Sequence, residues 1–244
     1  MSIDHIISQD ESSGKGTGAW LNFPREARHC FSDVEFCTAI RLRMHLPVIQ
    51  SSTHQYCRRF SSTGTLCCQT VDKYGLHCLL CKIGGHVVRR HNAERDELAR
   101  LLKEPSAVAS GVLLEQNAPN TPTENMRPDI VFHDFHSRVR HIDVEVCTPY
   151  QGRSTQQYRP GALIEQLEAV KRRKYRHLPL IPGVFSHLGR LGVGITGLLK
   201  LVYRGQDEQQ RSDSINLAYQ SLACTLQQQN VALLSSSNTL IAST

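Results

Sequence analysis

Acidic side chains crowd two neighbouring apolar segments in the middle of the chain. In RPDIVFHDFHSRVRHIDVEVCTPY (127–150), Asp129 and Asp134 lie in the first segment, and Asp143 and Glu145 lie in the second. Strands that enter a protein core seldom carry so many carboxylates. Either one face of a sheet is exposed to water here, or the carboxylates converge on a cation.

Alternation along the second segment shows which acids share a face. Every second residue from Ile142 to Val146 is apolar, so Asp143 and Glu145 lie together on the opposite side of an extended strand. A short turn at 135–139 would pair the two segments as a hairpin and place Asp129 near Asp143. Clustered carboxylates repel each other unless a cation neutralises them, and Mg²⁺ prefers oxygen ligands.

These two aspartates are therefore the candidate ligands of Mg²⁺ or Mn²⁺. Glu145 is a further candidate, as an extra ligand or a water-binding group. Asp134, at the far end of its strand, is assigned to the surface of the turn.

Two lysines follow on a segment, 161–177, that is expected to be helical. Its apolar residues fall at i, i+4 and i+7 and form one stripe: Leu163, Leu167 and Val170. Lys174 continues this stripe at i+11, so we expect it to face the sheet, with Lys171 one turn earlier at the stripe's edge. A lysine directed at carboxylates could orient a water molecule or stabilise a phosphorane. The alternative is that the lysine extends along the helix to solvent.

A second group of reactive side chains precedes these segments. Five of the nine cysteines crowd into 25 residues around His77: Cys57, Cys67, Cys68, Cys78 and Cys81. The N-terminus lacks the apolar segment of a secretory signal, so an intracellular protein with free thiols or a bound metal is expected, rather than a disulfide framework.

Zinc needs four ligands, and the spacing supplies three of them. These are Cys67 or Cys68, then His77, then Cys81 four residues later. For the fourth ligand, both adjacent cysteines could bind, Cys57 could fold in, or Cys78 could substitute. We favour Cys57, because adjacent cysteines point apart on an extended chain. The other interpretation is a group of reduced thiols without metal.

The elements that must position these residues follow from periodicity and capping. Helices are expected at 31–46 (capped by Ser32 or Asp33), 89–104 (capped by Asn92, with Leu98, Leu101 and Leu102 inward), 161–177, 189–204 and 207–231, and strands at 112–115, 129–134, 140–147 and 178–186. The order helix, three strands, helix, strand predicts an α/β fold with a mixed sheet flanked by helices.

The chain divides into five expected parts. They are a disordered segment at 1–18, a helical linker at 19–53, the Cys/His segment at 54–86, the α/β domain at 87–205, and a C-terminal helix with a disordered tail at 206–244.

Charge and hydropathy indicate the class of partner. The 244 residues carry a net charge of +6, and KRRKYRH (171–177) concentrates the basic residues. Such a block is typical of contact with nucleic acid, although a solvated helix face explains it as well. No apolar run approaches the roughly 18–20 residues that span a membrane.

The order of these motifs resembles a known family. In this chain the order is a zinc knuckle, the triplet Arg90-His91-Asn92, Pro128-Asp129, Asp143 and Lys171-x2-Lys174-Tyr175. The motif order resembles that of the restriction-like endonuclease region of site-specific non-LTR retrotransposons. These are PD-(D/E)xK nucleases whose lysine has moved to the next helix; Glu145 stands where the common pattern has lysine. The resemblance covers about residues 16–205, and this chain lacks the upstream knuckle cysteine, with Gly64 and Thr65 in its place.

The resemblance implies a restriction-endonuclease-like core (αβββαβ) that hydrolyses phosphodiester bonds with Mg²⁺ or Mn²⁺. Asp129 and Asp143 would bind the metal, and Lys174 or Lys171 would be the catalytic cation. The residues implied to contact DNA are Arg172, Arg173, Arg176 and Arg90. Target-site DNA and an element RNA would be the partners, and the nucleus the location.

Two further points follow from the resemblance. Many such nucleases have an additional acid, for which Glu94, Glu97 and Glu115 are candidates, although surface charge explains them as well. The chain contains no aromatic-x-Asp-Asp motif of a reverse transcriptase. The alternative function is a non-catalytic, truncated retrotransposon remnant that acts as a zinc-dependent nucleic-acid-binding module.

Overall fold

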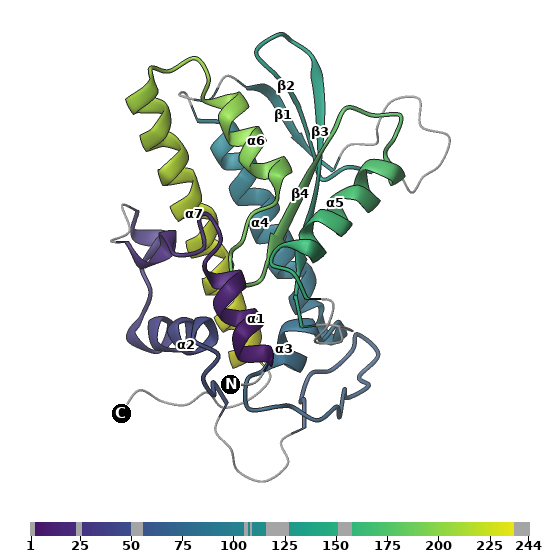
Figure 1. Cartoon of the computed structure of the whole chain (residues 1–244). Helices are drawn as coiled ribbons and strands as arrows, with labels where there is room; N and C mark the ends of the chain where they lie inside the picture. The colour runs from purple at the N-terminus through teal and green to yellow at the C-terminus, as the bar shows by residue number, and fades with distance from the viewer. Residues whose placement is uncertain are drawn as a thin grey trace.

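A four-stranded mixed sheet lies at the centre of the fold (Figure 1). A computed structural model describes residues 3–22, 26–49, 56–104, 107, 109–115, 127–150 and 158–236. The strands are β1 (Ser110–Leu114), β2 (Ile130–His133), β3 (Val139–Cys147) and β4 (Leu180–Ser186), in the order β1-β2-β3-β4. The first three are antiparallel, and β4 runs parallel to β3.

Helices surround this sheet and extend below it. They are α1 (Ile3–Ser12), α2 (Asp33–Arg43), α3 (Leu76–Leu80), α4 (His86–Leu102), α5 (Ala162–Lys174), α6 (Val193–Val202) and α7 (Glu208–Ser235), with 3-10 turns at Ala19–Leu21, Ala27–His29 and Ile83–Gly85. The predicted α/β class with a mixed, helix-flanked sheet is confirmed. Among the described residues, no helix has the length and apolar character needed to cross a membrane.

Two apolar clusters cover the two faces of the sheet. The larger one joins α4, α6 and α7 to the side chains of Ile142, Val144 and Phe185. The smaller one packs Ile164 of α5 against Val184 and Cys147 on the other face. Asp143 and Glu145 alternate with the buried Ile142 and Val144, so they lie on the α5 side, as the strand periodicity predicts.

Helix α5 is rotated by one residue relative to the predicted stripe. Val170 is half exposed and Lys174 is exposed, whereas the inward residues are Ile164, Glu168, Lys171 and Tyr175. The spacing i, i+4, i+7, i+11 is correct, but it begins one residue later. The inward polar residues have partners: Glu168 accepts a hydrogen bond from the amide of Gly194 at 2.8 Å, at the start of α6. The prediction that Lys174 faces the sheet is therefore wrong. A pattern of apolar residues does not show which charged residues are buried beside partners on other elements.

The predicted caps have mixed outcomes. Ser32 caps α2 in a reciprocal capping box with Glu35, as expected. Helix α4 begins at His86, after Gly85 in the left-handed conformation, so Asn92 lies inside the helix and does not cap it. Leu98, Leu101 and Leu102 are buried, as predicted.

The first residues form a helix, α1, where disorder is expected from composition. The helix is fixed by polar contacts: Ser8 donates to the carbonyl of Arg43 at 3.0 Å, and Glu11 accepts from the amide of Gly161 at 2.9 Å. Glu11 also pairs with Arg190 at 3.0 Å. A polar segment lacks the apolar pattern from which an ordered helix is predicted. Buried ionic contacts can nevertheless fix such a segment to the rest of the fold. The expected tail from 237 onward lies outside the described residues.

Candidate functional site

A lysine of α5 and two carboxylates of β3 form one partly buried ion-pair cluster. The ammonium of Lys171 contacts Oδ2 of Asp143 and lies 3.1 Å from Oε2 of Glu145. The hydroxyl of Tyr175 donates to Oδ1 of Asp143 at 3.0 Å. The Lys171 side chain is 9% exposed and that of Glu145 is 40% exposed, so the cluster is open to solvent on the Glu145 side.

Asp129 joins the cluster from the neighbouring strand. It precedes β2, one step beyond the pair Ile130–Ile142 in the β2–β3 ladder. Its Oδ2 accepts from the amide of Val144 at 2.6 Å and lies 3.3 Å from Nε2 of His91. Asp129 therefore reaches β3 beside Asp143, in agreement with the predicted hairpin.

The charges of the cluster stabilise one another. Burial by itself would lower the pKa of Lys171, but the carboxylates of Asp143 and Glu145 outweigh burial and raise it. The hydrogen bond to Asp129 is the main cause of a raised pKa at His91. Burial and the charge of Asp143 raise the pKa of Tyr175, so its hydroxyl stays protonated and donates to the carboxylate. Lys171 is therefore a buried ammonium held by acids.

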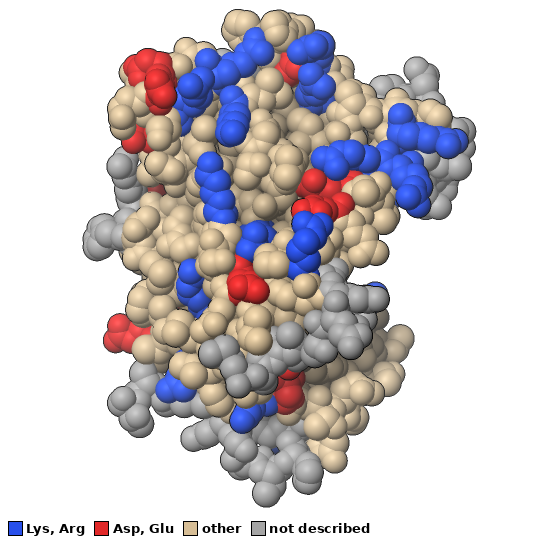
Figure 2. Space-filling model, viewed as in Figure 1, with Lys and Arg blue, Asp and Glu red and all other residues tan. Residues whose placement is uncertain are grey.

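Basic side chains gather at the end of α5, as the sequence predicts (Figure 2). Arg172 and Arg173 are exposed, and so is Arg176 just beyond the helix. Arg172 pairs with Glu168 at 3.2 Å. Lys174 lies outside the acidic cluster, with its ammonium 4.5 Å from the ring centroid of Tyr175.

Arg90 does not belong to this basic surface, contrary to its assignment as a DNA contact. Its side chain is 1% exposed and donates to Oδ1 of Asn230 at 3.0 Å and to the carbonyl of Leu79 at 3.2 Å. Burial lowers the pKa of Arg90 to about 10. Arg90 thus connects α4 to α7 and α3, and it cannot reach a ligand outside the core.

Two of the three candidate further acids, Glu94 and Glu97, are buried, and Glu115 is exposed. Glu94 is fully buried without a hydrogen-bond partner in the described part of the chain, and burial raises its pKa well above the usual range. Glu97 is held by Arg28 and Arg100. Glu115 contacts Arg95 and Arg127. The last two acids are therefore occupied by arginines.

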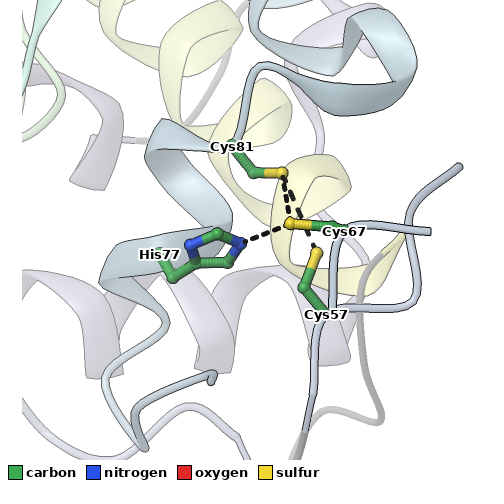
Figure 3. Close-up of side chains that lie close together, drawn as sticks. All are labelled: Cys57, Cys67, His77 and Cys81. Carbon is green, nitrogen blue, oxygen red and sulfur yellow. Dashed lines mark hydrogen bonds between the residues drawn. The ribbon is translucent and has the colours of Figure 1, made fainter. Parts of the chain in front are cut away.

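Three cysteines and a histidine converge at a second site, shown in Figure 3. Their ligand atoms all lie within 4.8 Å of one another: Cys57, Cys67, His77 and Cys81. The Sγ–Sγ distances are 3.8 Å for Cys57–Cys81 and 3.7 Å for Cys67–Cys81, and Nε2 of His77 lies 3.4 Å from Sγ of Cys67. In the described ranges, no other group of three His, Cys, Asp or Glu side chains has its ligand atoms close enough together to hold a metal ion in this way.

The distances fit a tetrahedral metal centre. With Zn–S bonds of about 2.3 Å and Zn–N bonds of roughly 2.0–2.1 Å, tetrahedral edges are ~3.8 Å between sulfurs and ~3.6 Å between sulfur and nitrogen. These three spacings are close to the tetrahedral values, and all four ligand atoms lie within 4.8 Å of one another. Burial raises the pKa of the Cys57 thiol to about 12, so its thiolate needs a cation nearby. The cluster could hold a metal such as zinc.

Local structure brings the four ligands together. Cys57 and Cys67 lie on two paired extended segments, in which the amide of Cys67 donates to the carbonyl of Arg59 at 2.9 Å. His77 lies in α3 and Cys81 at its end. The expectation that Cys57 is the fourth ligand agrees with this geometry. Cys68, a predicted alternative, is exposed and lies outside the group; its backbone is left-handed, with a positive φ of 53°, and not extended as the sequence argument assumed.

Arg59 anchors the Cys/His centre to the rest of the fold, a role that the sequence did not reveal. Its guanidinium donates to the carbonyls of Cys78 and Cys81 at 2.9 and 3.2 Å. It also donates to the carbonyl of Leu233 in α7. An arginine between two cysteine ligands was the available signal, but its partner is 174 residues away in sequence.

No protein-family model matches the sequence, and no curated protein matches it.

Proposed function

We propose that this chain is a metal-dependent DNA endonuclease module, similar to the restriction-like endonuclease region of site-specific non-LTR retrotransposons. The observation that carries the proposal is the partly buried contact of Lys171 with Asp143 and Glu145, beside Asp129. Removing a lysine ammonium from water costs free energy, which nearby carboxylates offset in part. Charged groups that are buried beside specific partners in this way are frequent at functional sites.

The order of the elements supports the same proposal. The sequence α4, β1, β2, β3, α5, β4 agrees with the αβββαβ core of restriction-endonuclease-like proteins. In this interpretation, Asp129 and Asp143 are the paired acids, and Lys171, on the helix after the second acid, is the migrated lysine.

The two aspartates provide the oxygen ligands that Mg²⁺ and Mn²⁺ prefer, from adjacent strands. A bound divalent ion would activate water and stabilise charge on the leaving oxygen. The protein's own groups prepare the site. The amide of Val144 fixes Asp129, and the hydroxyl of Tyr175 fixes Asp143. The ammonium of Lys171 would stabilise negative charge on the phosphate.

The solvent-facing side of the cluster is the side from which substrate would approach. Glu145 is the most exposed of the three acids. Three exposed arginines lie at or just beyond the C-terminal end of α5: Arg172, Arg173 and Arg176. Their charge would bind the phosphodiester backbone without reading its sequence.

Nicking of supercoiled plasmid in Mg²⁺ or Mn²⁺ tests the proposal. The wild type and the control Asp96→Asn, which changes an exposed acid of α4, are expected to nick, and Asp143→Asn is expected not to. Equal cleavage by all three proteins, or none by the wild type, would contradict a nuclease.

The spacing of the Cys/His group favours a second candidate, a non-catalytic zinc-dependent nucleic-acid-binding module. Such a protein would bind DNA or RNA in a mobility-shift assay and leave both intact. Loss of binding in Cys57→Ser, with no nicking by the wild type, is the result that this candidate predicts.

A further inference from the structure

Phe135, in the turn between β2 and β3, and Arg204, just after α6, lie together at the surface. Phe135 is 59% exposed, although the guanidinium carbon of Arg204 lies only 4.4 Å from its ring centroid. His136 lies edge-on to Phe135, with 5.4 Å between the ring centroids. Arg204 also lies 2.9 Å from Nε2 of His136. Three side chains from two distant segments therefore form one assembly.

The turn that carries Phe135 is fixed from below by Asp134. Its carboxylate accepts from the amides of His136 and Arg138 at 2.9 and 3.1 Å, and it pairs with Arg140 at 2.9 Å. The side chain of Asp134 is buried, so its assignment to turn surface is wrong. These bonds close the loop and fix the backbone of the turn that carries the exposed Phe135.

Neither the apolar core nor an ion pair with a carboxylate accounts for the exposed position of Phe135 beside Arg204. Phe135 belongs to none of the apolar clusters of the described chain, and within the described ranges Arg204 contacts His136 and the Phe135 ring and has no carboxylate partner. Figure 2 shows Lys and Arg side chains over α6 and the nearby hairpin. An exposed ring next to the Arg204 guanidinium, which has no carboxylate partner in the described ranges, fits a ligand that has both a flat π face and negative charge.

The positive surface continues from this turn along α6. Lys200 precedes Arg204 by one helical turn and lines an open cavity of about 470 Å³ between α6 and α7. Lys15 and Arg211 line the same cavity, together with Glu208. Three cations and one acid surround this space, so it suits an anion such as a phosphodiester.

We propose that Phe135 and Arg204 form a stacking platform for an unpaired nucleic-acid base, whose backbone continues over Lys200 towards the cavity. Aromatic rings stack with any base, and neighbouring cations bind the phosphates between bases. Phe135 lies at the opposite end of β2 from Asp129, about 20 Å away at the rise of an extended strand. The platform is thus separate from the acidic cluster. The inference rests on the proposed nucleic-acid function and adds a contact to it.

Fluorescence anisotropy with a labelled single-stranded DNA and the matching duplex tests the platform, in buffer that contains Zn²⁺ but no Mg²⁺, so that cleavage does not interfere. Phe135→Ala is expected to weaken single-strand binding by about fivefold or more and to weaken duplex binding less. Phe135→Trp is expected to retain affinity. Val193→Ala, which trims another exposed side chain (69% exposed), is the control and should bind like the wild type.

Tryptophan fluorescence distinguishes base stacking at position 135 from a purely structural role of Phe135. The one native tryptophan, Trp20, is buried, so quenching of Phe135→Trp by the oligonucleotide reports stacking at the turn. Unchanged affinity of Phe135→Ala, an equal loss for duplex and single strand, or no quenching would overturn the platform. If Phe135→Ala loses single-strand affinity and the wild type does not nick DNA, the platform is supported and the proposed nuclease function is contradicted.

Discussion

Lys171 of α5 contacts Asp143 of β3 on the face of the sheet that α5 covers, away from the main apolar core. The pair is partly buried, and Glu145 and Tyr175 complete its surroundings. An ammonium in such a place keeps its charge because the acids offset the loss of hydration. The expected effects of changing this pair differ from those of changing any exposed lysine on the same helix.

Lys171→Met and Lys174→Met form a matched pair that tests this difference. The first change leaves two carboxylates without their cation, and we expect nicking to fall at least about 100-fold, as when a preorganised charge is removed from an active site. The second changes an exposed side chain and should leave nicking within about twofold of the wild type. The reverse ranking in a plasmid-nicking time course would contradict the assignment of Lys171.

Metal content distinguishes the cysteines in the same way. Purified protein is expected to contain about one zinc per chain, and Cys57→Ser to contain well under one, because three ligands seldom retain structural zinc. Cys68→Ser, at a cysteine outside the group, should keep the metal. The measurement is elemental analysis after dialysis. Equal zinc in both variants would contradict the four-ligand set.

Removal of zinc should also lower stability, since binding energy at such a site contributes to folding. The chelated protein is expected to melt at a lower temperature than the zinc form, and readdition of Zn²⁺ should restore the melting temperature. Cys57→Ser serves as the control, because chelator should hardly change its melting temperature. An identical shift in Cys57→Ser would show that the chelator acts elsewhere.

The sequence predicted most of the secondary structure because local signals dominate there. Strand alternation placed Asp143 and Glu145 on one face, and Ser32 marked the start of α2. Helix α5 shows the limit. Its apolar stripe was one residue out of register, since Glu168 and Lys171 face inward and are stabilised by partners on other elements.

The candidate sites divide in the same way. Spacing pointed to Cys67 or Cys68, to His77 and to Cys81, and a steric argument favoured Cys57 as the fourth member of the group that converges in the structure. Long-range partners were beyond reach: Arg59 binds the carbonyl of Leu233, and Arg90 binds Asn230, 140 residues away. No local pattern distinguishes an arginine that binds DNA from one that joins two helices.

The buried Glu94 makes stability depend on pH. Its pKa is raised in the folded protein, so the folded state keeps a proton that the unfolded chain loses as pH rises through the ordinary range of glutamate. The free energy of unfolding should therefore fall as pH increases above about 4.5, by up to roughly 1.4 kcal/mol per pH unit, until the pH reaches the raised pKa of Glu94. Glu94→Gln should remove this dependence and be the more stable protein at pH 8.

Urea denaturation at pH 5.5 and pH 8 measures the effect. The control is Glu208→Gln, at an exposed position at the start of α7. The difference between wild type and Glu94→Gln should grow from pH 5.5 to pH 8, and that for Glu208→Gln should stay constant. Parallel behaviour of the two variants would contradict a protonated Glu94.

The salt dependence of DNA binding tests the basic end of α5. Arg173 is exposed without an ion-pair partner among the described residues, whereas Arg159, before the same helix, is paired with Glu165. If Arg173 binds a phosphate, Arg173→Ala should weaken duplex binding and reduce the slope of log affinity against log salt by about 1. Arg159→Ala, which removes a guanidinium that is already paired with a carboxylate, should leave the slope unchanged.

Anisotropy titrations from roughly 50 to 200 mM salt cover the range in which the salt dependence of DNA binding is large. Equal slopes for wild type and Arg173→Ala would place the DNA backbone away from this end of the helix.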